Sequence, residues 1–177
     1  MVWPGTMQRV LVIGCSGTGK STFALALGAR TGLPVVHIDQ LFWLPCWVIA
    51  PNDEYRARLD DALARERWII DGMNTSTFDR RLSRADTIIW LQRSRLACCW
   101  RVGRRVLSSF GQVRPDMAPG CPEKFDWQFM KYVWSFPSKY QPRVVAALDR
   151  HEAWSRTIIL RSDSDSENFL RNLAQAA

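Results

Sequence analysis

Residues 14–21 have the sequence Gly-Cys-Ser-Gly-Thr-Gly-Lys-Ser and match the pattern G-x-x-x-x-G-K-[ST] at every fixed position. The glycines allow the backbone to wrap so that successive N–H groups point at phosphate oxygens. Lys20 would neutralise the β- and γ-phosphates, and the Ser21 hydroxyl would ligate Mg²⁺. The segment therefore predicts a phosphate-binding loop (P-loop) for ATP with Mg²⁺. The residues expected to bind the nucleotide are Gly14, Ser16, Gly17, Thr18, Gly19, Lys20, Ser21 and Thr22.

Two aspartates follow short apolar runs and could serve the same site. Asp71 directly follows the run 68–70, and Asp39 directly follows the run 35–38. In an open α/β sheet the carboxyl ends of the strands border the binding crevice, so both carboxylates should lie near Ser21. We predict substrate contacts for both: Asp71 also as a metal ligand with Ser21, and Asp39 toward an acceptor. A turn or capping role is the alternative for each. No glutamate stands beside Asp71, which counts against an ATPase that activates water.

Arginines form a second chemical group. Residues 93–114 contain six arginines and no acidic residue. Arg101 and Arg105 are four positions apart and share one face of a predicted helix, and Arg114 lies in the segment that follows. Such donors can stabilise the charge on a transferring phosphoryl group and exclude water. We therefore predict a catalytic set of Lys20, Arg101, Arg105 and Arg114, with a solvated basic face as the alternative for the arginines.

Five short apolar runs must position these residues. They are rich in β-branched residues and do not alternate with polar ones, which is typical of parallel strands covered on both faces. The runs are residues 10–13, 35–38, 68–70, 87–91 and 157–160.

Helical patterns separate the runs. One spans residues 21–31 and ends at Gly32, and a second begins near Asn52, an N-cap candidate. The second pattern has apolar residues at helical spacing, namely Tyr55, Leu59, Ala62 and Leu63. A third has the stripe Leu96, Cys99, Trp100, Gly103, Val106, Leu107 and Phe110. This alternation predicts a doubly wound α/β fold with three layers.

Residues 111–140 interrupt the alternation, because four prolines lie among aromatic residues there. We predict an irregular loop followed by one or two short helices. Long insertions in compact domains are often lids or binding elements. We interpret residues 1–177 as a single domain, with an acceptor-binding insert at about 40–66 and a lid insertion at about 108–140.

Composition limits the classes of protein. The chain has 177 residues, 47% of them hydrophobic and 23% charged, as expected of one globular domain. It contains no apolar run of the ~20 residues that a membrane helix needs, and residues 1–7 lack the features of a signal peptide. We expect a cytoplasmic protein without membrane contact and with a short disordered leader before Gln8.

The five cysteines lack metal or disulfide spacing and indicate reduced thiols. His37 and His151 are interpreted as packed or surface residues.

Together these residues resemble the adenylate-kinase-like branch of P-loop proteins and, more narrowly, the bacterial DNA topology modulation proteins. The narrower resemblance depends on residues 37–43, 68–72, 85–89, 114–117 and 120–123. It implies a five-stranded parallel sheet of order 2-3-1-4-5, an acceptor-binding insert after the second strand and an arginine-bearing lid. Arg101 and Arg105 resemble the arginine pair with which nucleotide kinases hold ATP.

The chain departs from these families at three places. Residues 73–75, Met-Asn-Thr, follow Asp71-Gly72 and supply no arginine for a monophosphate acceptor. Cys46 stands where a glycine is common, and residues 92–95, Gln-Arg-Ser-Arg, replace Asp-x-Pro-Arg. The identity of the acceptor therefore stays open, while Asp116 and Glu123 are expected to shape the lid.

Two functions fit this sequence. One is a phosphotransferase that moves the γ-phosphoryl group of ATP to a nucleotide or another small acceptor. The alternative is a nucleotide-binding regulatory protein that acts on DNA topology without kinase activity. The net charge of +7 permits DNA as a partner, but no recognisable DNA-reading motif is present. We therefore favour the kinase, and the oligomeric state stays open.

Overall fold

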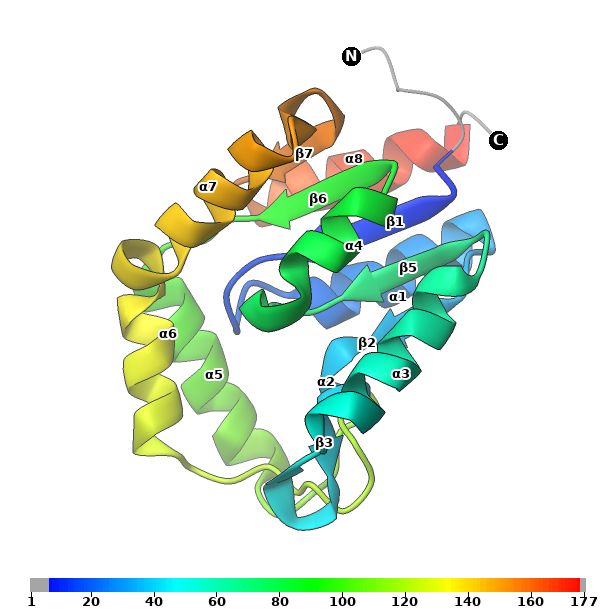
Figure 1. Cartoon of the computed structure of the whole chain (residues 1–177). Coiled ribbons are helices and arrows are strands. Elements are labelled where there is room, and N and C mark those ends of the chain that lie inside the picture. The colour runs from blue at the N-terminus through cyan, green and yellow to red at the C-terminus, as the bar shows by residue number, and fades with distance from the viewer. Residues whose placement is uncertain (1–6, 176–177) are drawn as a thin grey trace.

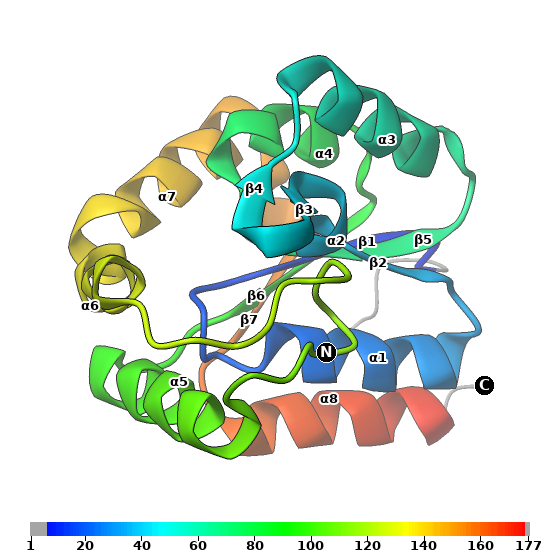
Figure 2. The ribbon, with the colours of Figure 1, turned by 90° about the horizontal axis from the view of Figure 1, so that it is seen from below.

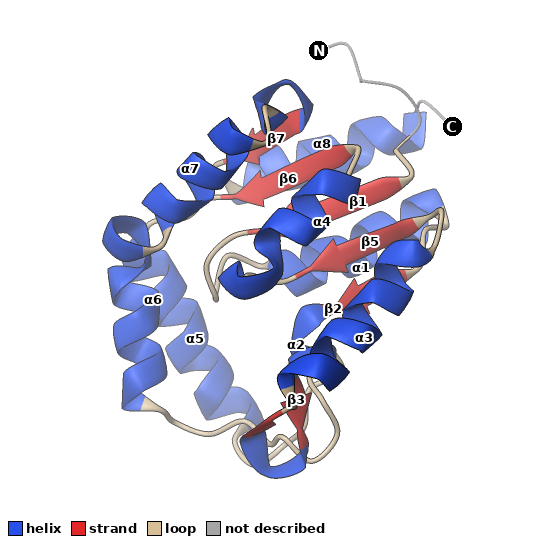
Figure 3. Ribbon diagram, in the orientation of Figure 1, coloured by secondary structure: helices blue, strands red, loops and turns tan. Residues whose placement is uncertain are grey.

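A five-stranded parallel sheet forms the centre of the computed structural model, which describes residues 7–175 (Figures 1 and 3). The strands are β1 (Arg9–Ile13), β2 (Val35–His37), β5 (Trp68–Asp71), β6 (Thr87–Leu91) and β7 (Thr157–Leu160). Their spatial order is β2-β5-β1-β6-β7, which is 2-3-1-4-5 when the strands of this sheet are counted along the chain. The predicted fold class and strand order are confirmed. Apart from Met7, the expected leader lies outside the described residues.

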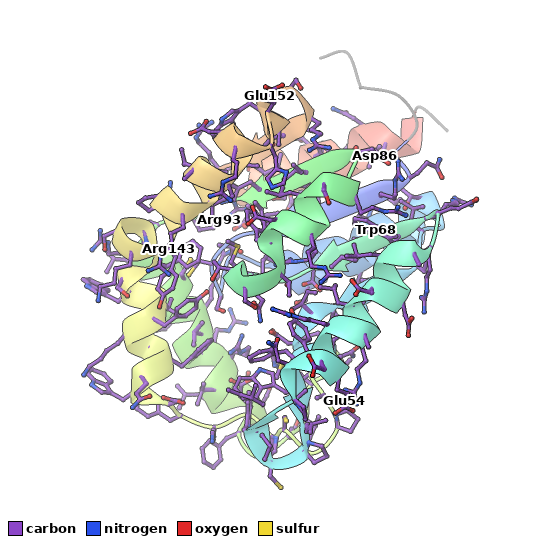
Figure 4. All side chains as sticks on the ribbon, viewed as in Figure 1. Glu54, Trp68, Asp86, Arg93, Arg143 and Glu152 are labelled. Atoms are coloured by element: carbon purple, nitrogen blue, oxygen red, sulfur yellow. The ribbon has the colours of Figure 1, made fainter. Side chains whose placement is uncertain are left out.

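Helices cover both faces of the sheet and complete the three layers (Figure 2). One face is covered by α1 (Lys20–Thr31) and α8 (Asp163–Gln175), and the other by α3 (Asn52–Ala64), α4 (Phe78–Arg84) and α7 (Gln141–Arg150). All residues of β5 and β6 are buried as a result, which explains why these strands lack alternation. Trp68, labelled on β5 in Figure 4, is fully buried. Among the described helices, none is long and apolar enough to cross a membrane.

Two further helices extend from one end of the sheet. They are α5 (Arg95–Ser109) and α6 (Trp127–Lys139), which pack against each other. The buried residues of α5 are Cys98, Val102 and Val106. Most of the predicted apolar stripe is wrong as a buried face, because Leu96, Trp100, Leu107 and Phe110 are 67–85% exposed. The side of α5 that is buried depends on where α6 and the P-loop lie, and apolar spacing alone does not contain that information.

The second predicted helix also needs a correction at its start. Asn52 is the first residue of α3, and the N-cap is Pro51, which has no side-chain capping bond. The predicted apolar residues of this helix, Tyr55, Leu59, Ala62 and Leu63, are buried as expected.

A small antiparallel hairpin lies between the second strand and α3. Its strands are β3 (Trp43–Leu44) and β4 (Val48–Ile49), and α2 (Ile38–Phe42) precedes it. Cys46, in the turn of the hairpin, has a φ of 64°. This left-handed conformation is easiest for glycine, so Cys46 adopts it at a cost in backbone strain.

The irregular segment 111–126 lies against this hairpin (Figure 1). The Cys46 N–H donates to the Gly120 carbonyl at 2.8 Å, and the Trp47 indole N–H donates to the Pro122 carbonyl at 3.0 Å. Met117, Ala118 and Cys121 form a small buried cluster with Trp43 and Trp47. Two segments more than 70 residues apart in the chain thus form one wall beside the carboxyl ends of the strands.

Arg81 on α4 holds the segment that follows Asp71. Its guanidinium is fully buried and donates to the carbonyls of Gly72, at 2.8 Å, and Asn74. Burial lowers the pKa of Arg81 to about 10, so the side chain keeps its charge near neutral pH.

We expect Arg81→Met to reduce the free energy of unfolding by about 2–4 kcal/mol, because one buried and one partly buried carbonyl lose their donor. Arg80→Met on the same helix is the control, since Arg80 forms an exposed ion pair with Asp60 and should change stability by less than about 0.5 kcal/mol. Urea unfolding measures both. Equal losses in the two variants would contradict this role of Arg81.

Candidate functional site

The P-loop connects β1 to α1 and passes close to two neighbouring elements. Gly14 has a φ of +147°, and a Cβ added there would lie 2.4 Å from the Leu91 carbonyl oxygen at the end of β6. Gly17 has a φ of +85°, and its added Cβ would lie 2.5 Å from the Cys98 carbonyl oxygen in α5. Both positions therefore require glycine for space as well as for backbone conformation.

Side chains of the loop stabilise its curved shape. The Thr18 hydroxyl donates to the Cys15 carbonyl at 2.8 Å, and Lys20 Nζ donates to the same carbonyl at 3.3 Å. α1 begins at Lys20, so its free N–H groups add a partial positive charge at this end. A cleft borders the loop, and residues 16–22 line it. Gly14 does not line the cleft; its close approach to the end of β6 helps to fix the position of the loop.

Ser21 and Asp71 place two oxygen ligands together. The Ser21 hydroxyl donates to Asp71 Oδ2 at 2.9 Å, and Asp71 is 3% exposed at the last position of β5. Mg²⁺ prefers oxygen ligands and usually takes only one or two from the protein, with phosphates and water completing its shell. This pair fits such an ion. Within residues 7–175 no cluster of three or more His, Cys, Asp or Glu side chains could hold a metal by itself.

His37 is the hydrogen-bonding partner of Asp71 that sequence reasoning missed. Its Nδ1 contacts Asp71 Oδ1, while Oδ2 faces Ser21. Burial lowers the pKa of His37, but the hydrogen bond and the charge of Asp71 outweigh it, so the pKa is raised overall. The parallel register of β2 and β5 pairs these two residues directly. The sequence did contain a signal for this contact, because His37 and Asp71 are polar residues at the ends of two apolar runs that form neighbouring strands.

Asp39 lies in the first turn of α2 rather than at the end of the strand, which corrects its predicted placement. The residue is exposed toward the cleft, and protein atoms pack closely around its carboxylate on the other sides. This burial raises the pKa of Asp39, and the charges of Lys20 and Arg114 oppose the rise. Asp39 is thus a carboxylate close to the P-loop lysine and open to a bound molecule.

The predicted arginines also line the cleft, and each of them pairs with an acid. Arg101 contacts Asp163 at the start of α8. Arg105 lies 3.0 Å from Glu123, and Arg114 lies 3.1 Å from Asp116 and 2.9 Å from Glu123. The pattern of arginines predicted their common location, but not their partners.

The cleft contains further residues that were not among the predicted site residues. Aromatic side chains that line it are Phe23, Phe42, Trp43, Trp47, Phe129, Tyr132 and Tyr140, and residues 73–75 also line it. Arg93, labelled in Figure 4, has a structural role: it donates to the carbonyls of Gln92, Leu160 and Ser162 and so ties the end of β6 to the start of α8.

The fold and this site define a P-loop kinase architecture. No protein-family model matches the chain, and no curated protein sequence does. Solved structures match over nearly the whole chain. A gluconokinase from Sinorhizobium meliloti is 16% identical, with a TM-score of 0.54 over 98% of this chain and 97% of the other. Shikimate kinase from Acinetobacter baumannii, in complex with shikimate, is 14% identical, with a TM-score of 0.57 over 97% and 93%. These similarities show the fold; the resemblance to DNA topology modulation proteins rests on sequence motifs alone.

The contact between Gly17 and α5 gives a test of the loop. We expect Gly17→Ala to cost about 2 kcal/mol or more in stability and to weaken ATP binding, because the loop must move away from Cys98 and adopt a strained φ. Gly103→Ala on α5 is the control, since its added Cβ meets nothing within 4 Å and should stabilise the helix by about 0.5–1 kcal/mol. Urea unfolding and ATP titration check both, and unchanged ATP affinity in Gly17→Ala would count against this loop geometry.

Proposed function

We propose that this chain is an ATP- and Mg²⁺-dependent phosphotransferase that moves the γ-phosphoryl group of ATP to a small hydroxyl-bearing acceptor. The observation that carries the proposal is Asp39, a carboxylate open to the cleft and close enough to Lys20 for the lysine charge to act on its pKa. A lysine suited to the γ-phosphate and a carboxylate suited to act as the base for the acceptor thus line the same cleft. A cytoplasmic location, where ATP is abundant, is part of the same proposal.

In the proposed reaction the N–H groups of residues 16–21 and Lys20 hold the β- and γ-phosphates. Ser21 and Asp71 would hold Mg²⁺, which neutralises phosphate charge when bound. Asp39 orients the acceptor hydroxyl and takes its proton as the new O–P bond forms and the bond to ADP breaks. N–H groups of Arg101, Arg105 and Arg114 that the acids leave free stabilise the transferring group.

The arrangement of the arginines favours an enclosed site over an open DNA-binding surface. Arg93 and Arg101 pair with Asp163, and Arg105 and Arg114 pair with Glu123. Four of the six arginines in the basic segment therefore contact acids that lie outside that segment. A surface that follows a nucleic-acid backbone gains its affinity from cations that contact phosphates directly. The gluconokinase and the shikimate kinase with a similar fold are both named for a small-molecule acceptor, which supports the same choice.

A screen of ATP consumption over nucleoside monophosphates, nucleosides and small alcohols tests the proposal. At least one acceptor should give saturable transfer, and Lys20→Ala should lower kcat/KM by about 10²–10³-fold while circular dichroism shows an intact fold. Lys139→Ala, near the end of α6, is the control and should behave as the unchanged protein. If no acceptor raises turnover above slow background hydrolysis and DNA binds with a steep salt dependence, the regulatory alternative replaces the kinase.

The proposed base gives a second prediction, on pH. Protonated Asp39 cannot accept a proton, so kcat should fall as the pH falls through its pKa. Because burial raises this pKa, the fall should begin above the usual range of an aspartate. Asp39→Asn should remove that limb of the pH profile and lower kcat by about 10²–10⁴-fold with unchanged ATP affinity. Asp53→Asn, in the exposed first turn of α3, is the control. A variant that keeps the acid limb would exclude Asp39 as the base.

A further inference from the structure

The acceptor end of the cleft lies between α2 and the segment 111–126. The Gln40 side-chain amide donates to the Pro115 carbonyl at 2.7 Å, which holds this segment beside Asp39. The charges of Arg114 and Asp116 both act on the Asp39 carboxylate. A molecule that reaches Asp39 therefore meets Arg114, Asp116 and the nearby Glu123 as well.

The two arginines of this region are already occupied by acids of the chain itself. Glu123 contacts Arg105 through Oε1, at 3.0 Å, and Arg114 through Oε2, at 2.9 Å. Asp116 is a second partner of Arg114, at 3.1 Å. The Glu123 side chain is only 5% exposed, and those of the two arginines 24% and 20%, so water screens these pairs weakly.

Glu123 is also fixed by its backbone. Its N–H donates to the Gln112 carbonyl at 2.8 Å, and its carbonyl accepts from the Gly111 N–H at 2.9 Å. The carboxylate therefore stays between the two guanidinium groups. Three carboxylates (Asp39, Asp116 and Glu123) thus accompany two guanidinium groups at the acceptor end, and Lys20 and the exposed Arg104 line the same cleft.

Such a site disfavours an anionic acceptor. A carboxylate or phosphate brought beside Asp39 would lose its hydration and meet the like charge of that carboxylate. Arg105 and Arg114 would compensate this cost poorly, because both already pair with acids of the chain. Lys124, another cation that lines the cleft, is exposed and lies with its Nζ 5.5 Å from the centre of the Trp47 ring. A neutral hydroxyl group, by contrast, can donate to Asp39, and Phe42, Trp43 and Trp47 offer apolar faces to a carbon skeleton.

We propose that the acceptor is an uncharged polyhydroxy compound, and that Glu123 determines this specificity by occupying Arg105 and Arg114. The inference rests on the proposed kinase function and adds the chemical class of the acceptor. Glu123 acts through the two arginines, whose remaining N–H groups stay available to the transferring phosphoryl group.

The test compares acceptors in matched pairs on one carbon skeleton: alditols and sugars against the corresponding aldonates and sugar monophosphates. With ATP and Mg²⁺ present, the neutral member should have a kcat/KM at least about tenfold higher than its anionic partner. Glu123→Gln should lower this ratio by about tenfold or more, because it removes the carboxylate that both guanidinium groups share without removing side-chain volume. Glu66→Gln, an exposed change of the same charge, is the control and should leave the ratio unchanged.

Asp116→Asn provides a second variant in case Glu123→Gln does not fold, and it should lower the ratio by a smaller factor, because it removes only one of the two acids that contact Arg114. A preference for the anionic member in the unchanged protein would overturn the inference, and so would a ratio that neither variant alters. Failure of the kinase proposal looks different: no member of any pair would be phosphorylated. Acceptor binding to the protein with ADP, measured by thermal shift, then decides the inference, since it predicts stabilisation by the alditol and none by the aldonate.

Discussion

The hydrogen bond between the Ser21 hydroxyl and the Asp71 carboxylate joins the P-loop to the neighbouring strand, and the rest of the site depends on it. It requires the parallel register of β1 and β5, in which Val12 is opposite Asp71, and the β2 register that brings His37 to the other carboxylate oxygen. A shift of one residue in either pairing would turn Asp71 to the opposite face of the sheet. The buried apolar strands therefore position the polar groups at their ends.

The proposed nucleotide side and the proposed acceptor side of the cleft are built in different ways. The nucleotide side is a local structure, in which a strand, eight residues of loop and the start of α1 supply most of the groups that face phosphate. The acceptor side is assembled from α2, the hairpin β3–β4 and the segment 111–126, which are held together by hydrogen bonds and a small aromatic cluster. Few of these contacts follow a pattern in the sequence.

Charge pairing explains how one chain can combine a strongly basic segment with an acidic acceptor end. Arginines at residues 93–114 attract phosphate only to the extent that they lack partners, and Asp163 and Glu123 pair with four of them. Paired guanidinium groups keep fixed orientations and free N–H donors while contributing less net charge than unpaired ones. Such groups stabilise a transferring phosphoryl group by position more than by attraction, and this also limits what can bind beside Asp39.

The sequence by itself determined the layers and the P-loop, because these follow from local patterns: β-branched runs, glycine spacing and a lysine before a hydroxyl. The strand order was implied only by the resemblance to adenylate-kinase-like proteins. The sequence also indicated that Asp39, Asp71 and the arginines gather at one edge, since the carboxyl ends of parallel strands meet there. Only the tertiary structure decided which face of α5 is buried, that His37 contacts Asp71, and that Glu123 lies between Arg105 and Arg114. Each of these depends on residues brought together from distant parts of the chain. Packing, register and backbone anchoring select those pairings, and no single segment of the sequence contains that information.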